Sequence, residues 1–182
     1  MRCFLTLLAL LFHAMTFGQN AEPCSADTLH SSEIDHSESY ARNFEAVRAA
    51  VQRLQAESNR DMELYTIPVV VHVIHRGSPL GENENISDAQ IQSQLDILNE
   101  DFRRLNADQD DAWAQAADTQ IEFCLAAQDP DGNESNGILR VPTTVGSFGT
   151  NDGMKFTAQG GSDAWPASEY MNFWVCNIGG GI

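Results

Sequence analysis

Residues 67–75 read Ile-Pro-Val-Val-Val-His-Val-Ile-His, and this stretch decides the fold class of the chain. It is rich in β-branched residues and too short for a typical buried helix, so it predicts a strand. Because both of its faces are apolar, we expect the strand in the middle of a sheet that is covered on both sides. Pro68 is tolerated because it stands at the beginning of the strand.

The segment after this strand carries the clearest helix signal. Ser87 is an N-cap residue and Gln90 completes a capping box, while Ile86 and Ile91 stand where a hydrophobic staple closes across the cap. An apolar stripe then recurs at helical spacing, formed by Ile91, Leu95, Leu98, Phe102 and Leu105. We predict a helix over residues 87–105.

Further apolar segments predict strands after this helix. Residues 121–127 and 171–178 are the clearer two, and residues 138–141 predict a short strand. The order strand, helix, strand favours a right-handed crossover between parallel strands, and hence an α/β fold. Residues 142–162 contain five glycines among polar residues and look irregular.

The beginning of the chain predicts an export signal. Arg2 precedes an apolar run over residues 4–17, and residues 16–18 (Thr-Phe-Gly) place small side chains at positions −3 and −1 of a cleavage site. We therefore expect residues 1–18 to be removed and the mature protein to be secreted. The run is shorter than the roughly 20 residues that span a bilayer, and no later segment is long enough.

Residues 19–63 form a polar segment that contains one amphipathic pattern. Its apolar positions mark one face of a helix and are Tyr40, Phe44, Val47, Val51 and Leu54. We expect this helix to pack on the domain that follows, which begins at residue 64. The domain boundaries predicted from the sequence are therefore 1–18, 19–63 and 64–182.

Charge and composition exclude several classes of partner. The chain has 26 acidic and 10 basic side chains, which gives a formal net charge of −16. Such a field repels phosphate backbones and anionic lipids, so we expect neither nucleic acid nor a membrane surface as partner. Apolar residues make up 42% of the chain, which is enough for a core, and charged residues make up 20%, which is too few for a disordered acidic tail.

The histidines of the predicted sheet do not form a metal site. His72 and His75 are three residues apart in a strand, so alternation points them to opposite faces, and we expect them to be packed or hydrogen-bonded around the sheet. The zinc motif HExxH is absent from the 182 residues, as are a nucleophile elbow, a phosphate-binding loop and a dinucleotide fingerprint.

An acidic turn is the other candidate for a metal. Asp129, Asp131 and Asn133 copy the first three ligand positions of an EF-hand loop. Glu134 and Arg140 stand where that loop needs Gly and Glu, so an EF-hand is excluded. The pattern favours a tight turn between strands, and a less regular calcium site stays open.

The ordered set of segments resembles the pappalysin family of secreted metzincin metalloproteases, whose bacterial members are often called cytophagalysins. The resemblance covers about residues 65–182 and rests on residues 67–75, 86–106, 121–137, 137–140 and 171–179. It implies an α+β zincin-like fold, in which a helix backs a twisted, mostly parallel sheet. Residues 64–182 would be the incomplete upper subdomain of the catalytic domain, and residues 19–63 a prosegment.

The resemblance also implies a function and a cofactor. In that family a helix with the pattern HExxHxxGxxH follows shortly after the segment that ends this chain, and its three histidines bind zinc. None of these residues is present here, so the chain is expected to be an inactive N-terminal fragment of a zinc endopeptidase that acts on proteins or peptides. The alternatives are a secreted non-catalytic binding or inhibitory module and a truncated fragment without a function of its own.

Three cysteines remain after signal cleavage, and an odd number leaves one thiol unpaired or paired outside the chain. Related latent proteases carry a cysteine near the start of the prosegment whose thiolate occupies the open zinc position, and Cys24 stands at that place. The family more often has Gly after this cysteine, whereas Pro23 precedes and Ser25 follows it here. The equal alternative is a disulfide with Cys124, Cys176 or a cysteine outside the chain. A Cys124–Cys176 bond is not expected, because the fold would place the two on either side of the first strand.

Overall fold

The computed structural model describes residues 25–56, 63–110, 112–113 and 116–179. They belong to two compact units, one within residues 1–60 and one within residues 61–182, and each is considered by itself. The predicted signal and Cys24 lie outside the described residues. Within the described residues, no helix has the length and apolar character that a membrane crossing requires.

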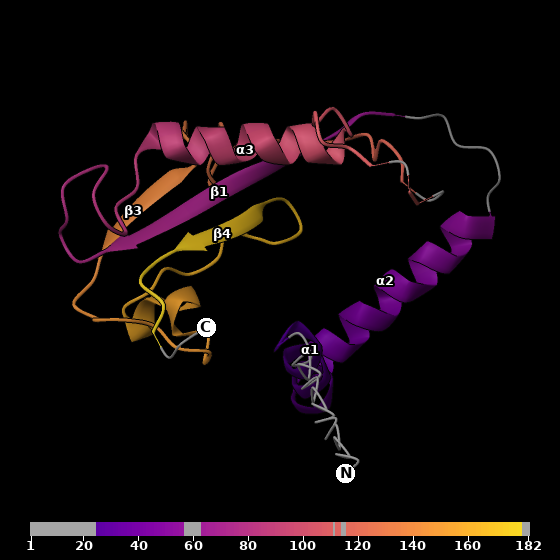
Figure 1. Cartoon of the computed structure of the whole chain (residues 1–182). Coiled ribbons are helices and arrows are strands. Elements are labelled where there is room, and N and C mark those ends of the chain that lie inside the picture. The colour runs from indigo at the N-terminus through magenta and orange to yellow at the C-terminus, as the bar shows by residue number, and fades with distance from the viewer. Residues whose placement is uncertain (1–24, 57–62, 111, 114–115, 180–182) are drawn as a thin grey trace, which may run out of the picture. The chain divides into compact units, whose positions relative to one another are not determined.

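The first unit contains two helices, α1 (Ser25–His36) and α2 (Glu38–Ala56) (Figure 1). Helix α2 contains the predicted amphipathic pattern, so this helix is confirmed. Helix α1 was not predicted, because its sequence is polar and has no helical stripe of apolar residues. His30 of α1 packs edge-on against Tyr40 and Phe44, whereas Val47 and Val51 of the same stripe are exposed.

The second unit is organised around the strand β1 (Tyr65–His75). Residues 69–74 of β1 are buried, which confirms the prediction of a central strand covered on both faces. Three strands pair with β1, all in parallel: β2 (Ile121–Leu125), β3 (Ile138–Pro142) and β4 (Met171–Val175). Each of these strands begins at the predicted residue, and β2 and β4 end two and three residues early.

The partner strands occupy both edges of β1. In a parallel ladder the N–H and C=O of one residue point to one edge, and those of its neighbour point to the other. The Val69 C=O accepts from the Ala126 N–H at 2.8 Å, next to β2. The Val71 N–H donates to the Gly137 C=O at 2.8 Å, next to β3. Because residues 69 and 71 point to the same edge, β2 and β3 follow one another along it and β4 takes the opposite edge.

Helix α3 (Asp88–Phe102) covers one face of the sheet (Figure 1). Its N-cap is confirmed, since the Ser87 hydroxyl accepts from the Gln90 N–H at 3.2 Å. The buried core on this face contains Ile91 and Leu95 of α3 with Val69, Val71, Val73 and Phe123. The helix ends three residues before the predicted end, because Arg104 has a φ of 53° and reverses the chain. Leu105 is exposed as a result.

The β3–β4 connection, residues 143–170, covers the other face, where Val70, His72 and Ile74 are buried. It contains two short 3-10 helices, η1 (Gly153–Lys155) and η2 (Thr157–Gln159), so the expectation of an irregular segment is corrected in part. Gly161 lets these turns approach closely, because a Cβ there would lie 2.2 Å from the Met154 carbonyl oxygen.

Candidate functional site

An apolar groove of about 470 Å³ runs between α3 and β4. Its apolar side chains include Ile86, Ile91, Leu95 and Leu98 from the helix side, and Phe173 and Val175 from β4. Gln90 and Gln94 add uncharged amides, and no charged residue lines the groove, although the chain carries 26 acidic side chains. A groove with this lining is a candidate site for another polypeptide or a ligand.

The outer edge of β4 adjoins this groove. Among the described strands, β1 alone pairs with β4, so alternate backbone N–H and C=O groups of β4 point away from the sheet. Residues 171–175 contain neither Pro nor a charged side chain, which are the features that commonly protect an edge strand from pairing. Groove and edge together can therefore accept an additional strand with apolar side chains.

A polar cluster lies on the opposite face, around His72. The His72 ring is fully buried, its Nδ1 lies 2.8 Å from the Ser162 hydroxyl and its Nε2 lies 3.0 Å from Asn172 Oδ1. The ring stacks on Trp174, with 5.0 Å between the ring centroids. Burial lowers the pKa of His72, and the hydrogen bond to Asn172 opposes that shift. Both ring nitrogens are occupied by protein groups, so the cluster holds the fold together and offers no free metal ligand.

His75 points to the other face of β1, as predicted. Its Nδ1 accepts from the Gly77 N–H at 3.1 Å and so shapes the turn after the strand. The two histidines do not share a site, and the structural role predicted for them is confirmed for His72 by its two partners.

The turn at residues 129–133 is a tight turn, as the sequence favoured. Asp129 Oδ1 accepts from the N–H groups of Asp131 at 3.0 Å and Asn133 at 2.8 Å, and Oδ2 accepts from the Asn133 amide at 3.0 Å. The Asn133 side chain is the main reason why the pKa of this carboxyl lies below its usual range. Both carboxylate oxygens are thus bonded within the turn. No group of three or more His, Cys, Asp or Glu that could hold a metal occurs in the described part of the chain.

The two described cysteines, Cys124 and Cys176, lie on different strands of the sheet or next to them. Cys124 is exposed on β2 and Cys176 is half-buried just after β4, so they lie at opposite edges of β1, and both are free thiols. The prediction concerning a bond between these two cysteines stays a prediction. Burial raises the pKa of the Cys176 thiol, which makes it a poor nucleophile. Pairing of either residue with Cys24 lies outside the described residues.

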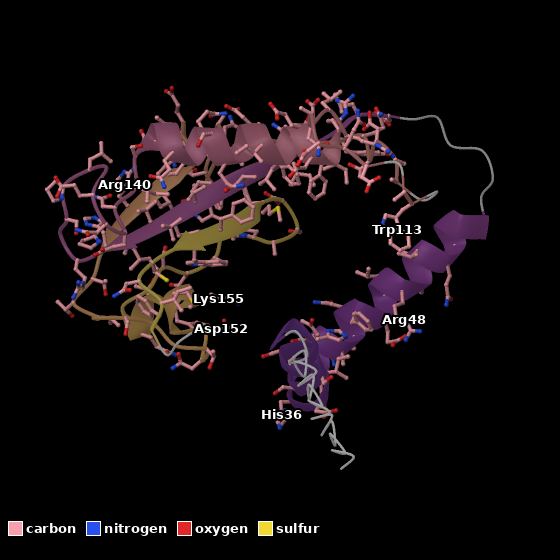
Figure 2. All side chains as sticks on the ribbon, in the orientation of Figure 1. His36, Arg48, Trp113, Arg140, Asp152 and Lys155 are labelled. Atoms are coloured by element: carbon pink, nitrogen blue, oxygen red, sulfur yellow. The ribbon has the colours of Figure 1, made fainter. Side chains whose placement is uncertain are left out.

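Sequence reasoning missed the partners of His72 and the groove. Asn172 is a polar residue inside an otherwise apolar strand, and this was the available signal for the cluster. A second missed contact joins β3 to the start of α3, where Arg140 donates to Asn85 Oδ1 at 2.6 Å and also pairs with Asp88 (Figure 2). Nothing in the local pattern around Arg140 indicates that contact.

Comparison with known proteins identifies the fold. No family model and no curated protein matches the chain, whereas several solved structures do. Mature mirolysin of Tannerella forsythia in complex with a cleaved peptide is 48% identical with a TM-score of 0.60, over 66% of this chain and 45% of that one. Mirolysin in complex with a small compound is 49% identical with a TM-score of 0.59, over 64% and 44% of the two chains.

The pro-form of the same protein matches a larger share of this chain. A mutant of Tannerella forsythia promirolysin is 39% identical with a TM-score of 0.61, over 80% of this chain and 48% of that one. The chain therefore spans less than half the length of these three structures. It carries part of the metalloprotease fold of mirolysin, with a mostly parallel, twisted sheet and a backing helix, as expected of an incomplete zincin-like domain.

Proposed function

We propose that this chain is the N-terminal part of a secreted, zinc-dependent metalloendopeptidase of the pappalysin type. The observation that carries the proposal is the 48% identity, over 66% of the chain, to mature mirolysin in complex with a cleaved peptide. Identity at this level goes beyond a shared fold, which by itself says little about activity. We propose peptides or proteins as the substrates of the complete enzyme on the same ground.

The described residues do not fit a zinc site. They contain no cluster of three His, Cys, Asp or Glu, the nitrogens of His72 are bonded to Ser162 and Asn172, and the 182 residues lack HExxH. A catalytic zinc needs three protein ligands around an open position. We therefore assign no catalytic step to this chain, and we propose that it is inactive by itself and that the remainder of the enzyme supplies the zinc ligands.

The groove between α3 and β4 is the surface through which, in our proposal, this unit supports the rest of the complete enzyme. An uncharged groove beside an unprotected strand edge supports the attachment of further polypeptide, because leaving both in water is unfavourable. In our proposal the remaining half of the catalytic domain covers this surface. The β1-centred sheet then acts as the rigid support on which the zinc-binding half is held.

Residues 19–63 are proposed to be a prosegment that keeps the enzyme latent. The match to promirolysin covers 80% of the chain and the match to the mature form covers 66%, which supports a prosegment ahead of the second unit. Cys24 is the proposed ligand that blocks the zinc, because a thiolate binds zinc well and would displace the reactive water. Export with removal of residues 1–18 completes the proposal.

The test compares the protein made from the complete coding sequence with residues 19–182 alone. We expect about one zinc ion per molecule of the complete protein. We expect none in the shorter one, because a catalytic zinc needs three protein ligands. Once the prosegment has been removed, the zinc-containing protein should cleave a fluorogenic peptide, and a chelator should abolish that cleavage. A complete protein without zinc and without peptide cleavage would contradict the proposal and favour a secreted, non-catalytic binding module.

A further inference from the structure

His72 joins three parts of the second unit at one buried point. It belongs to β1, it contacts Asn172 and Trp174 of β4, and it contacts Ser162 of the β3–β4 connection. Trp174 Nε1 also donates to the Ser162 carbonyl at 2.9 Å, which ties the same connection to β4. The cluster therefore holds residues 143–170 against the face of the sheet that α3 does not cover.

The hydrogen bonds around His72 suit a neutral ring. The Asn172 amide nitrogen donates to the Trp165 carbonyl at 3.0 Å and to the Tyr170 carbonyl at 3.3 Å, so Oδ1 is the atom that faces His72. Since this oxygen only accepts, Nε2 carries the hydrogen, and Nδ1 accepts from the Ser162 hydroxyl. A protonated ring would donate from both nitrogens, and the Ser162 hydroxyl would have to turn its own hydrogen away from the ring inside a buried site.

No carboxylate is among the causes that shift the pKa of His72, which are burial and the hydrogen bond to Asn172. Strand β4 contains no titratable residue, and Cys176 after it has a raised pKa and stays neutral. In the β3–β4 connection, Asp152 is paired with Lys155 at 3.0 Å (Figure 2), and Asp163 accepts from the Thr157 N–H at 3.0 Å. The Lys155 ammonium lies 5.9 Å from the Trp174 ring centroid and adds positive charge near the stack. Burial consequently dominates and lowers the pKa of His72.

We propose that His72 is a proton-controlled latch, which holds the β3–β4 connection on the sheet while the ring is neutral and releases it on acidification. In the released state the ring meets water and binds a proton near its ordinary pKa of 6.5. In the closed state it does so only at lower pH. The ratio of released to closed molecules should therefore rise about tenfold per pH unit below about 6.5, until the closed state is protonated as well.

Lys155 provides a site-specific probe, because it is the only lysine of the 182 residues. It lies in η1, where its own N–H bonds the Asp152 carbonyl at 2.9 Å and the next N–H bonds the Gly153 carbonyl at 3.2 Å. A lysine-specific protease needs this segment extended, so cleavage after Lys155 reports how often the connection opens. The cleavage rate of the full chain should be divided at each pH by that of a free peptide of residues 150–160, which removes the pH dependence of the protease.

We expect this ratio to be constant from pH 8 to about 6.5 and to rise up to about tenfold by about pH 5.5, a range that lies above ordinary carboxylate pKa values. The His72→Gln variant should lose the rise, and the His75→Gln variant, altered on the other face of the same strand, should keep it. Cleavage at Arg140 by an arginine-specific protease should stay unchanged, because β3 remains paired. A flat ratio in the unaltered chain, a rise that persists in His72→Gln, or a parallel rise at Arg140 would overturn the proposal.

A measurement on the unaltered chain covers the case in which His72→Gln does not fold. The His72 ring proton, followed by NMR, should titrate below the ordinary histidine value of about 6.5. Its midpoint should match the pH at which the cleavage ratio levels off. Titration at the ordinary value, or a midpoint unrelated to that of cleavage, would refute the latch. None of these outcomes depends on zinc or on the proposed peptidase activity of the complete enzyme, so the latch and the proposed function are tested separately.

Discussion

Leu95 is the position at which the packing of α3 on the sheet can be measured most directly. Its side chain is 2% exposed and contacts the cluster around Val69 and Phe123, while Ile97 on the same helix is 52% exposed. Leu95→Ala removes three buried carbon atoms, and at about 0.8 kcal/mol for each the transfer loss is about 2.4 kcal/mol. The cavity left behind raises the total toward the range of about 2–5 kcal/mol seen for such changes.

The open groove decides where in this range Leu95→Ala should fall. Because Leu95 also lines the groove, the space left by its side chain opens to solvent, so the loss should lie near the lower end, at about 2–3 kcal/mol. Urea unfolding followed by tryptophan fluorescence measures it, and with a slope of about 1–3 kcal/mol/M the midpoint should fall by about 0.7–3 M. Ile97→Ala is the matched control and should cost under about 1 kcal/mol. Equal losses for the two variants would refute the assignment of Leu95 to the core.

Three further results are expected from other parts of the chain. Cys24→Ala in the complete protein should raise the peptidase activity of the unprocessed form, whereas Cys124→Ala should not, and unchanged latency would contradict the zinc-blocking role. Ser87→Ala should lower the unfolding free energy by about 1 kcal/mol through loss of the N-cap, as a shift in the thermal midpoint, and an unchanged midpoint would speak against the cap. The pKa of Asp118 lies below its ordinary 3.8, chiefly because its carboxylate accepts from the Gln120 N–H. Its contribution to stability should be complete above pH 3.8 and be lost as the pH falls through the lower folded-state value, and an Asp118→Asn variant should lack this component in acid unfolding curves.

Elements with a strong local pattern could be predicted from the sequence, including the first residues of β2, β3 and β4, whereas the last residues of α3, β2 and β4 could not. The Val-rich run of β1 and the stripe and cap of α3 act through neighbours along the chain, so they are visible without a structure. The end of α3 depends on residues outside the helix, because Arg103 pairs with Asp118 and Glu122 further along the chain. Leu105 continues the apolar stripe and therefore suggests a longer helix. Helix α1 was missed because its sequence is polar, while its ring contacts run from His30 to Tyr40 and Phe44 of α2.

The candidate site was less predictable because it depends on pairs that are distant in sequence. The groove forms because β4 pairs with β1 beside α3. The sequence of a single strand does not show which edge of the sheet it will take. The buried cluster likewise needs Ser162 and Asn172 to meet His72 across the β3–β4 connection. The negative conclusions were more secure, since the absence of HExxH and the turn chemistry at Asp129 can be read directly from the residues.

The central position of β1 also determines when this unit can fold. Every pairing in the sheet involves β1, and its partners stand far along the chain, with Val69 opposite both Leu125 and Met171. Among the described strands no hairpin joins two neighbours, so a long loop must close before each pair of strands can form its hydrogen bonds, which slows folding. During synthesis β1 emerges before its three partner strands, and the edge that β4 takes stays unpaired until residues 171–175 have emerged. We expect the newly made chain to depend on chaperones over that interval.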